Sequence, residues 1–206
     1  LDRLLQRHLS RDQFNFSLGK PLADYPLVAH ALTWLSLHKD KISNHHARLL
    51  LHSPYLYGSK TELIARSQTL QNNPLLQEAD IPFNRFVDEL NSTLPKLAHI
   101  LNNTSNYPTQ DTPQGWINHF KNRLKEFGFP GEYPLNSSAY QCFQRMMGLF
   151  DEMLQLSLIK PTMNAQQALT ALNDLAIATI FQTRKSTTPI QISGLLEASG
   201  CEFDSV

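Results

Sequence analysis

The chain has 206 residues, of which 41% are hydrophobic and 17% are charged, and its formal net charge at pH 7 is +0. The hydrophobic content is sufficient for one medium-sized domain with its own core, whereas the charged content lies below the roughly 25% of an average soluble protein. A net charge of zero excludes a global field that would draw the chain to nucleic acid or to a membrane surface. Nucleic-acid binding would therefore require a local basic patch or help from other domains.

The two cysteines, Cys142 and Cys201, stand far apart in the sequence. This spacing favours two free thiols in a reducing, cytoplasmic setting over a disulfide framework. No apolar run approaches 18 residues, so the sequence predicts no membrane span and no membrane partner.

The first quarter of the chain predicts one short strand among helices. Leucines in residues 1–9 keep helical spacing, and residues 14–18 (FNFSL) alternate as a strand does. Pro26 fits the first turn of a helix that ends near Lys39. Ser43 is expected to cap a further helix that continues through residue 52.

The next segment predicts shorter helices separated by breaks. Ser59 and Glu62 have capping-box spacing, which predicts a helix that runs to about Leu70. Residues 82–101 predict two helical pieces that meet at Pro95. Residues 102–111 (NNTSNYPTQD) have no apolar periodicity and predict a loop.

Three further helices are predicted where a capping residue precedes an apolar stripe with helical spacing. The three start signals are Thr112 before Pro113, Ser138 with Gln141, and Asn164 with Gln167. The first of these helices should end at Gly128 and the second before Pro161. Residues 181–188 then predict a polar loop.

The end of the chain predicts strand again. Residues 190–193 alternate apolar and polar side chains, and residues 203–206 begin a second apolar piece. The fold class is therefore mainly α: a helical insertion of about eight helices, flanked by short strands from an incomplete α/β domain. We expect three parts: residues 1–40 enter that α/β domain, residues 41–188 form the helical insertion, and residues 189–206 re-enter the sheet.

No catalytic or metal-binding constellation follows from spacing alone. The adjacent pair His45-His46 points in two directions on a helix, and the other histidines lack Cys or carboxylate partners at ligand spacing. No phosphate-cradling G-x-x-x-x-G-K-[ST] and no G-x-S-x-G occurs. We therefore expect no metal, no cofactor and no catalytic residue in this chain.

The most specific stretch is Gly194 to Phe203, GLLEASGCEF. It resembles the T-L-H-S-A-K-G-L-E-F loop with which helicases of the UvrD/RecB type re-enter their second motor domain after a long helical insertion. Ala198, Gly200, Glu202 and Phe203 are kept. The Thr, His and Lys of the active pattern fall on Gly194, Leu196 and Ser199, so the resemblance implies an inactivated motor.

This departure is similar to the inactivated, AddB-like helicase subunits, and closest to a bacterial family of probable DNA repair proteins with a C-terminal RecB-like nuclease. Supporting segments are residues 14–28, 50–58, 127–141 and 180–200. The resemblance implies an internal fragment, with the nuclease motif beyond residue 206. The degenerate motif would comprise Gly194, Leu196, Glu197, Ser199, Gly200, Glu202, Phe203 and Asp204.

The resemblance also implies a function. The chain would be a non-catalytic scaffold module of a DNA repair exonuclease, shaping a DNA channel and bracing the nuclease. The parent protein would be an ATP-independent or weakly ATP-dependent exonuclease or helicase-like protein. DNA and a second helicase–nuclease subunit would be its partners. The DNA contacts expected are Arg184, Lys185 and Ser193. The alternative is a free-standing helical adaptor for protein–protein interaction.

Overall fold

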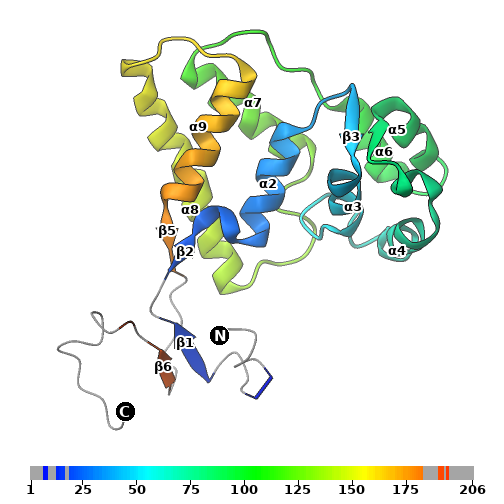
Figure 1. Cartoon of the computed structure of the whole chain (residues 1–206), viewed down its shortest axis with the longest axis horizontal. Coiled ribbons are helices and arrows are strands. Elements are labelled where there is room, and N and C mark those ends of the chain that lie inside the picture. Colours follow the sequence, from blue (N-terminus) through cyan, green and yellow to red (C-terminus); the bar gives the residue numbers. More distant parts are fainter. Residues whose placement is uncertain (1–6, 9–12, 17–18, 183–189, 193, 195–206) are drawn as a thin grey trace.

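The computed structural model describes residues 7–8, 13–16, 19–182, 190–192 and 194. Within these ranges the chain is mainly helical, with eight α-helices and a few short strands (Figure 1). This confirms the predicted fold class. Of the helix predicted in residues 1–9, only residues 7–8 are described, and they form a turn. The strand predicted in residues 203–206 and the thiol of Cys201 lie outside the described residues.

The helices follow one another with short connections. The α-helices are α2 (Pro26–Ser36), α3 (Asn44–His52), α4 (Leu63–Asn72), α5 (Phe83–Leu90), α6 (Pro95–Asn103), α7 (Pro113–Glu126), α8 (Ser137–Leu154) and α9 (Ala165–Ala178). The described ranges also contain three 3-10 helices: η1 (Leu22–Asp24) before α2, η2 (Pro74–Gln77) between α4 and α5, and η3 (Gln155–Leu158) directly after α8.

The strands form three separate pairs. β1 (Phe14–Phe16) is parallel to β6 (Ile190–Ile192), with Phe14 opposite Ile190. β2 (Lys20–Pro21) is antiparallel to β5 (Ile180–Phe181), and β3 (Lys41–Ser43) is antiparallel to β4 (Asp80–Pro82). The sequence predicts β1 and β6 correctly. The sequence predicts no strand elsewhere, and this is wrong: β2 to β5 are strands of two or three residues that are set by partners far away in the sequence, which a local pattern does not reveal.

The helical body is joined to the β1–β6 pair by a narrow stalk (Figure 1). The β2–β5 pair forms this stalk, and the backbone N–H of Leu22 extends it by donating to the Thr179 carbonyl at 2.8 Å. The hydroxyl of Tyr25 donates to the Phe181 carbonyl at 2.8 Å, and the two rings pack edge to face. The two ends of the body are therefore held side by side where they leave it.

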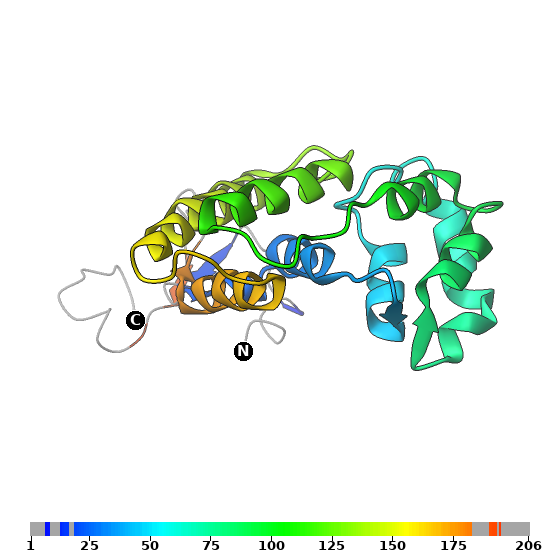
Figure 2. The same cartoon turned by 90° about the horizontal axis from the view of Figure 1, so that it is seen from above.

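The body contains two groups of helices, visible as separate clusters in Figures 1 and 2. Helices α2, α7, α8 and α9 pack together above the stalk, and helices α3 to α6 pack with the β3–β4 pair at the far end. One continuous hydrophobic core serves both groups. The stacked rings of Trp34 and Phe127, fully buried with centroids 6.1 Å apart, lie in this shared core.

A buried arginine fixes the joint between α2 and α7. Nη1 of Arg123 donates to the carbonyl oxygens of Leu35 and Leu37 at the end of α2, at 3.3 and 3.1 Å. Its Nη2 donates to the Ser105 carbonyl, and its guanidinium lies 3.5 Å from the centre of the Tyr107 ring. Carbonyls at a helix end have no partner within the helix. Arg123 supplies a donor to both, and the Leu35 carbonyl also accepts from the Tyr107 hydroxyl at 3.0 Å.

Most predicted helix starts are confirmed by their capping hydrogen bonds. The side chains of Ser43, Thr112 and Asn164 each accept a backbone N–H from three residues further on. Asn164 and Gln167 form a complete capping box. Pro26, Pro95 and Pro113 stand at helix starts, and Gly128 has φ of +69° directly after α7.

Two predicted capping boxes are wrong. The N-cap of α8 is Asn136, two residues before the expected Ser138, and its side chain accepts the N–H of Ala139. Glu62 lies at the start of α4, but Ser59 makes no cap there: its hydroxyl donates to the Pro54 carbonyl.

The connection between α7 and α8 packs against the segment that follows α3. The Tyr57 N–H donates to the Phe127 carbonyl at 2.9 Å, and the Lys60 N–H donates to the Glu132 carboxylate at 3.0 Å. Gly131 has φ of +97°, and a Cβ there would overlap the Pro54 carbonyl oxygen. A glycine is thus required both for the backbone conformation and for the close approach.

Candidate functional site

The site residues predicted from the sequence fall at the edge of the described part of the chain. The proposed DNA contacts Arg184, Lys185 and Ser193 lie outside it. Of the degenerate motif only Gly194 is described, partly buried and without regular secondary structure. The remaining motif residues lie outside it: Leu196, Glu197, Ser199, Gly200, Glu202, Phe203 and Asp204.

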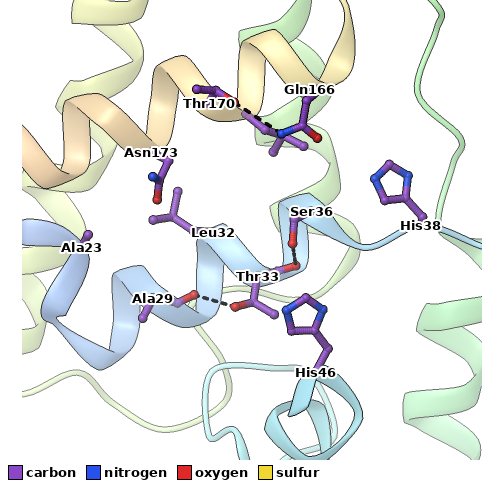
Figure 3. Close-up of a pocket in the computed structure, with 11 residues that line it drawn as sticks. Ala23, Ala29, Leu32, Thr33, Ser36, His38, His46, Gln166, Thr170 and Asn173 are labelled. Atoms are coloured by element: carbon purple, nitrogen blue, oxygen red, sulfur yellow. Dashed lines mark hydrogen bonds between the residues drawn. The ribbon is translucent and has the colours of Figure 1, made fainter. Parts of the chain in front are cut away.

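A groove of about 610 Å³ lies between α2 and α9. Figure 3 shows that it runs from Ala23, near the stalk, to His38 and His46 at the junction with the far helices. Its lining is Ala23, Ala29, Leu32, Thr33, Ser36, His38, His46, Gln166, Leu169, Thr170 and Asn173. Leu32 and Asn173 face one another between the two helices (Figure 3).

Several polar groups of this groove are already used within their own helices. The Thr33 hydroxyl donates to the Ala29 carbonyl, and the Ser36 hydroxyl donates to the Thr33 carbonyl, both at 2.9 Å. Such bonds to the carbonyl three or four residues earlier are common for these side chains in helices. The groove can therefore offer further hydrogen bonds chiefly through its amides and imidazoles.

The groove carries no formal charge. None of its lining residues is Asp, Glu, Lys or Arg. Burial, and then the neighbouring His45, lower the pKa of His46 below 6.5, so this imidazole is neutral at pH 7. Because phosphodiester recognition depends on cations, the groove is poorly suited to a DNA backbone. Its chemistry suits a neutral ligand rich in amides or hydroxyls.

The structure brings together one histidine–carboxylate pair that the sequence does not predict. Nε2 of His119 lies 2.9 Å from Oδ2 of Asp111, although eight residues separate them. Asp111 also accepts the Thr112 N–H at 2.7 Å, and this bond, followed by the His119 bond, lowers the pKa of Asp111. The backbone of Asp111 pairs with Met163 in both directions. The backbone pairing of Asp111 with Met163 thus anchors the start of α7 to the segment before α9.

Other reactive groups give no further site. Burial raises the pKa of the Cys142 thiol to about 11, so it stays protonated at pH 7. Among the residues that the structure describes, no group of three His, Cys, Asp or Glu side chains could hold a metal ion. Over the same ranges, no helix has both the length and the apolar composition needed to cross a membrane.

Comparison with known proteins gives no relative: no family model, curated protein or solved structure matches the chain. The resemblance to inactivated helicase subunits therefore rests on the sequence segments quoted above.

Proposed function

We propose that the chain is a non-catalytic helical module of a DNA repair exonuclease related to the helicase–nucleases. It would shape a channel for DNA and brace the nuclease domain. The observation that carries this proposal is the parallel pairing of β1 with β6. These two strands lie side by side although the entire helical body separates them in the sequence (Figure 1).

Parallel neighbours in a sheet need a crossover connection, which is usually a single α-helix. Here the connection contains all eight described α-helices and narrows to the β2–β5 stalk at its base. A body attached in this way is an insertion into the sheet to which β1 and β6 belong. Such an insertion is what the resemblance to UvrD/RecB-type helicases implies for this region.

The proposed DNA contacts follow from the position of the basic residues. The groove between α2 and α9 has no cation in its lining. Arg184 and Lys185 follow β5 and precede β6 in the sequence. Contacts at this place would put DNA beside the sheet and would be independent of base sequence, since phosphates carry no sequence information.

The first experiment measures single-stranded DNA binding by the full-length protein as a function of salt. Each phosphate contact contributes about −0.7 to the slope of log K against log salt for single strands. The double variant Arg184→Ala and Lys185→Ala should therefore flatten the slope by about 1.4. Affinity at low salt should fall several-fold.

The matched control is the double variant Lys41→Ala and Arg85→Ala, which removes the same charge from exposed ion pairs at the far end of the body. Its salt slope should equal that of the unchanged protein. An unchanged slope in the first variant would remove Arg184 and Lys185 from the interface. A full-length protein with neither DNA affinity nor exonuclease activity would overturn the proposed function.

If the full-length protein showed neither DNA affinity nor exonuclease activity, the second candidate function would apply: a helical adaptor for protein–protein interaction. The observation in its favour is the neutral groove between α2 and α9, whose amides and imidazoles suit a polypeptide segment. Substitution of Thr170 by Trp would fill this groove. The adaptor function predicts that this variant loses partner binding, whereas the DNA module predicts no effect on the salt slope.

A further inference from the structure

The groove between α2 and α9 has two matching walls. Each helix contributes residues at positions i, i+3, i+4 and i+7, which lie on one face of a helix. These are Ala29, Leu32, Thr33 and Ser36 on α2, and Gln166, Leu169, Thr170 and Asn173 on α9. Because seven residues advance about 10 Å along a helix axis, each wall has about this length.

The side-chain amide of Asn173 points into the groove, opposite Leu32 (Figure 3). Asn173 is half-buried and lines the groove itself, so a molecule in the groove reaches this amide directly. Within the described part of the chain the amide has no hydrogen-bond partner. A side-chain amide offers N–H donors and a carbonyl acceptor. Because covering such a group without a partner costs free energy, a ligand that covers Asn173 must both accept and donate there.

The other end of the groove makes the same demand. The imidazole of His46 is half-buried, stands 5.8 Å from the ring of His45 between centres, and makes no hydrogen bond to any described residue. In its neutral form it offers one donor and one acceptor. Gln166 makes one long bond of 3.4 Å from its Nε2 to Thr170, which leaves its side-chain carbonyl available.

An extended polypeptide supplies donors and acceptors in pairs. Each residue other than proline carries one N–H and one C=O, and in an extended chain the N–H and C=O of one residue point to the same side. The amide of Asn173 can therefore bond to both groups of a single residue. A bound α-helix could not offer them, because its peptide groups are bonded within the helix. At about 3.3 Å per residue, about three extended residues cover each wall.

The lining also selects for a segment without charge. None of the lining residues is Asp, Glu, Lys or Arg, so a charged side chain would lose water in the groove without gaining a counter-ion. Leu32 and Leu169 give each wall an apolar part, and the small Ala23 and Ala29 leave space near the stalk. An uncharged segment with small side chains matches both properties.

We propose that the groove binds an extended, uncharged segment of another polypeptide, and that Asn173 pairs with the N–H and C=O of one residue of that segment. The inference rests on the groove of the second candidate function, to which it adds the ligand class and the residue that recognises it. It requires nothing of the DNA contacts.

The experiment compares four synthetic peptides by ligand-observed saturation-transfer NMR on the full-length protein. The first is acetyl-Thr-Val-Thr-Val-Thr-dimethylamide, which is uncharged and whose β-branched residues favour an extended chain. The second is the same peptide N-methylated at every residue, which has no backbone donor. The third and fourth carry Glu or Lys in place of the middle Thr. The first peptide should bind saturably, and the other three at least about tenfold more weakly.

The variant Asn173→Leu removes the amide and keeps a side chain of similar size. It should weaken binding of the first peptide about tenfold, because two hydrogen bonds are lost, and it should narrow the difference between the first peptide and its N-methylated form. Asn122→Leu is the matched control, since Asn122 is exposed on α7 and does not line the groove. Thr170→Trp, which fills the groove from an exposed position, should abolish binding.

Four results would overturn the proposal. Equal affinity for the first peptide and its N-methylated form would show that the groove does not read the backbone. Tighter binding of a charged peptide would contradict the selection against charge. Unchanged binding by Asn173→Leu would remove the recognition residue, and no saturable binding of any peptide would remove the site.

The DNA proposal is tested separately on the same protein. Absent peptide binding with a normal salt slope for DNA would refute this inference alone. Peptide binding in a protein without DNA affinity would refute the DNA proposal alone.

Discussion

Single buried polar side chains hold together segments that are distant in the sequence. His30 is an example: its ring lies edge to face against Trp34 and Tyr55, and its Nδ1 is 2.7 Å from Ser53 Oγ. Burial, and secondarily His52, lower the pKa of His30 from 6.5 to about 4. The folded state therefore holds His30 neutral at a pH where the unfolded chain would protonate it.

The sign of the pH dependence follows from this shift. Because the folded pKa is below the unfolded one, the contribution of His30 to stability is complete above pH 6.5 and is lost as the pH falls toward 4. Allowing for the partial exposure of the ring, we expect a loss of about 1–2 kcal/mol between pH 7 and 4.5. Urea unfolding at both pH values measures it.

The variant His30→Gln should show a smaller loss between the two pH values by that amount. His99→Gln, at an exposed position, should behave like the unchanged protein and serves as the control. An identical pH dependence in all three proteins would contradict the assignment to His30.

At the scale of the element, the helix starts show which capping contacts the sequence can predict and which it cannot. A cap is a contact over three residues, so Ser43, Thr112 and Asn164 could be read from local spacing. The prediction of Ser138 as the N-cap of α8 is wrong, because Asn136 lies two residues earlier and caps the helix instead. The role of Glu62 could not be predicted, because its partner, the Lys96 N–H, is 34 residues away.

The N-caps of α8 and α9 allow a direct test of these capping contacts. Asn164→Ala and Asn136→Ala each remove a side chain that accepts a backbone N–H at the start of a helix, and each should cost about 1 kcal/mol of unfolding free energy. Ser138→Ala lies inside the first turn of α8 and should change stability by less than about 0.5 kcal/mol. Chemical denaturation of the three variants measures this. A cost for Ser138→Ala equal to that of Asn136→Ala would restore the cap predicted from the sequence.

At the scale of the whole molecule, the sequence predicts the mainly helical fold and the strands at both ends, but not how the two helix groups meet. Their junction depends on contacts between distant residues, such as His30 Nδ1 with Ser53 Oγ and the Tyr57 N–H with the Phe127 carbonyl. For the same reason the groove between α2 and α9 left no sequence signal, because residues from separate segments line it.

Because one core cluster serves both groups, we expect the helical body to unfold in a single cooperative transition. Arg123→Met would leave the Leu37 carbonyl without its buried donor and would remove one donor each from the carbonyls of Leu35, which keeps the Tyr107 hydroxyl, and of the exposed Ser105. Each unsatisfied buried group costs about 1–3 kcal/mol, partly offset by water that reaches the joint. We therefore expect a loss of about 3 kcal/mol of unfolding free energy and a lower denaturant midpoint, with the transition still single when followed by both fluorescence and circular dichroism.

Lys125→Met, at an exposed position of the same helix, is the matched control and should change the midpoint little. Two separate transitions in Arg123→Met would show instead that the helix groups are independent units joined mainly by this one side chain.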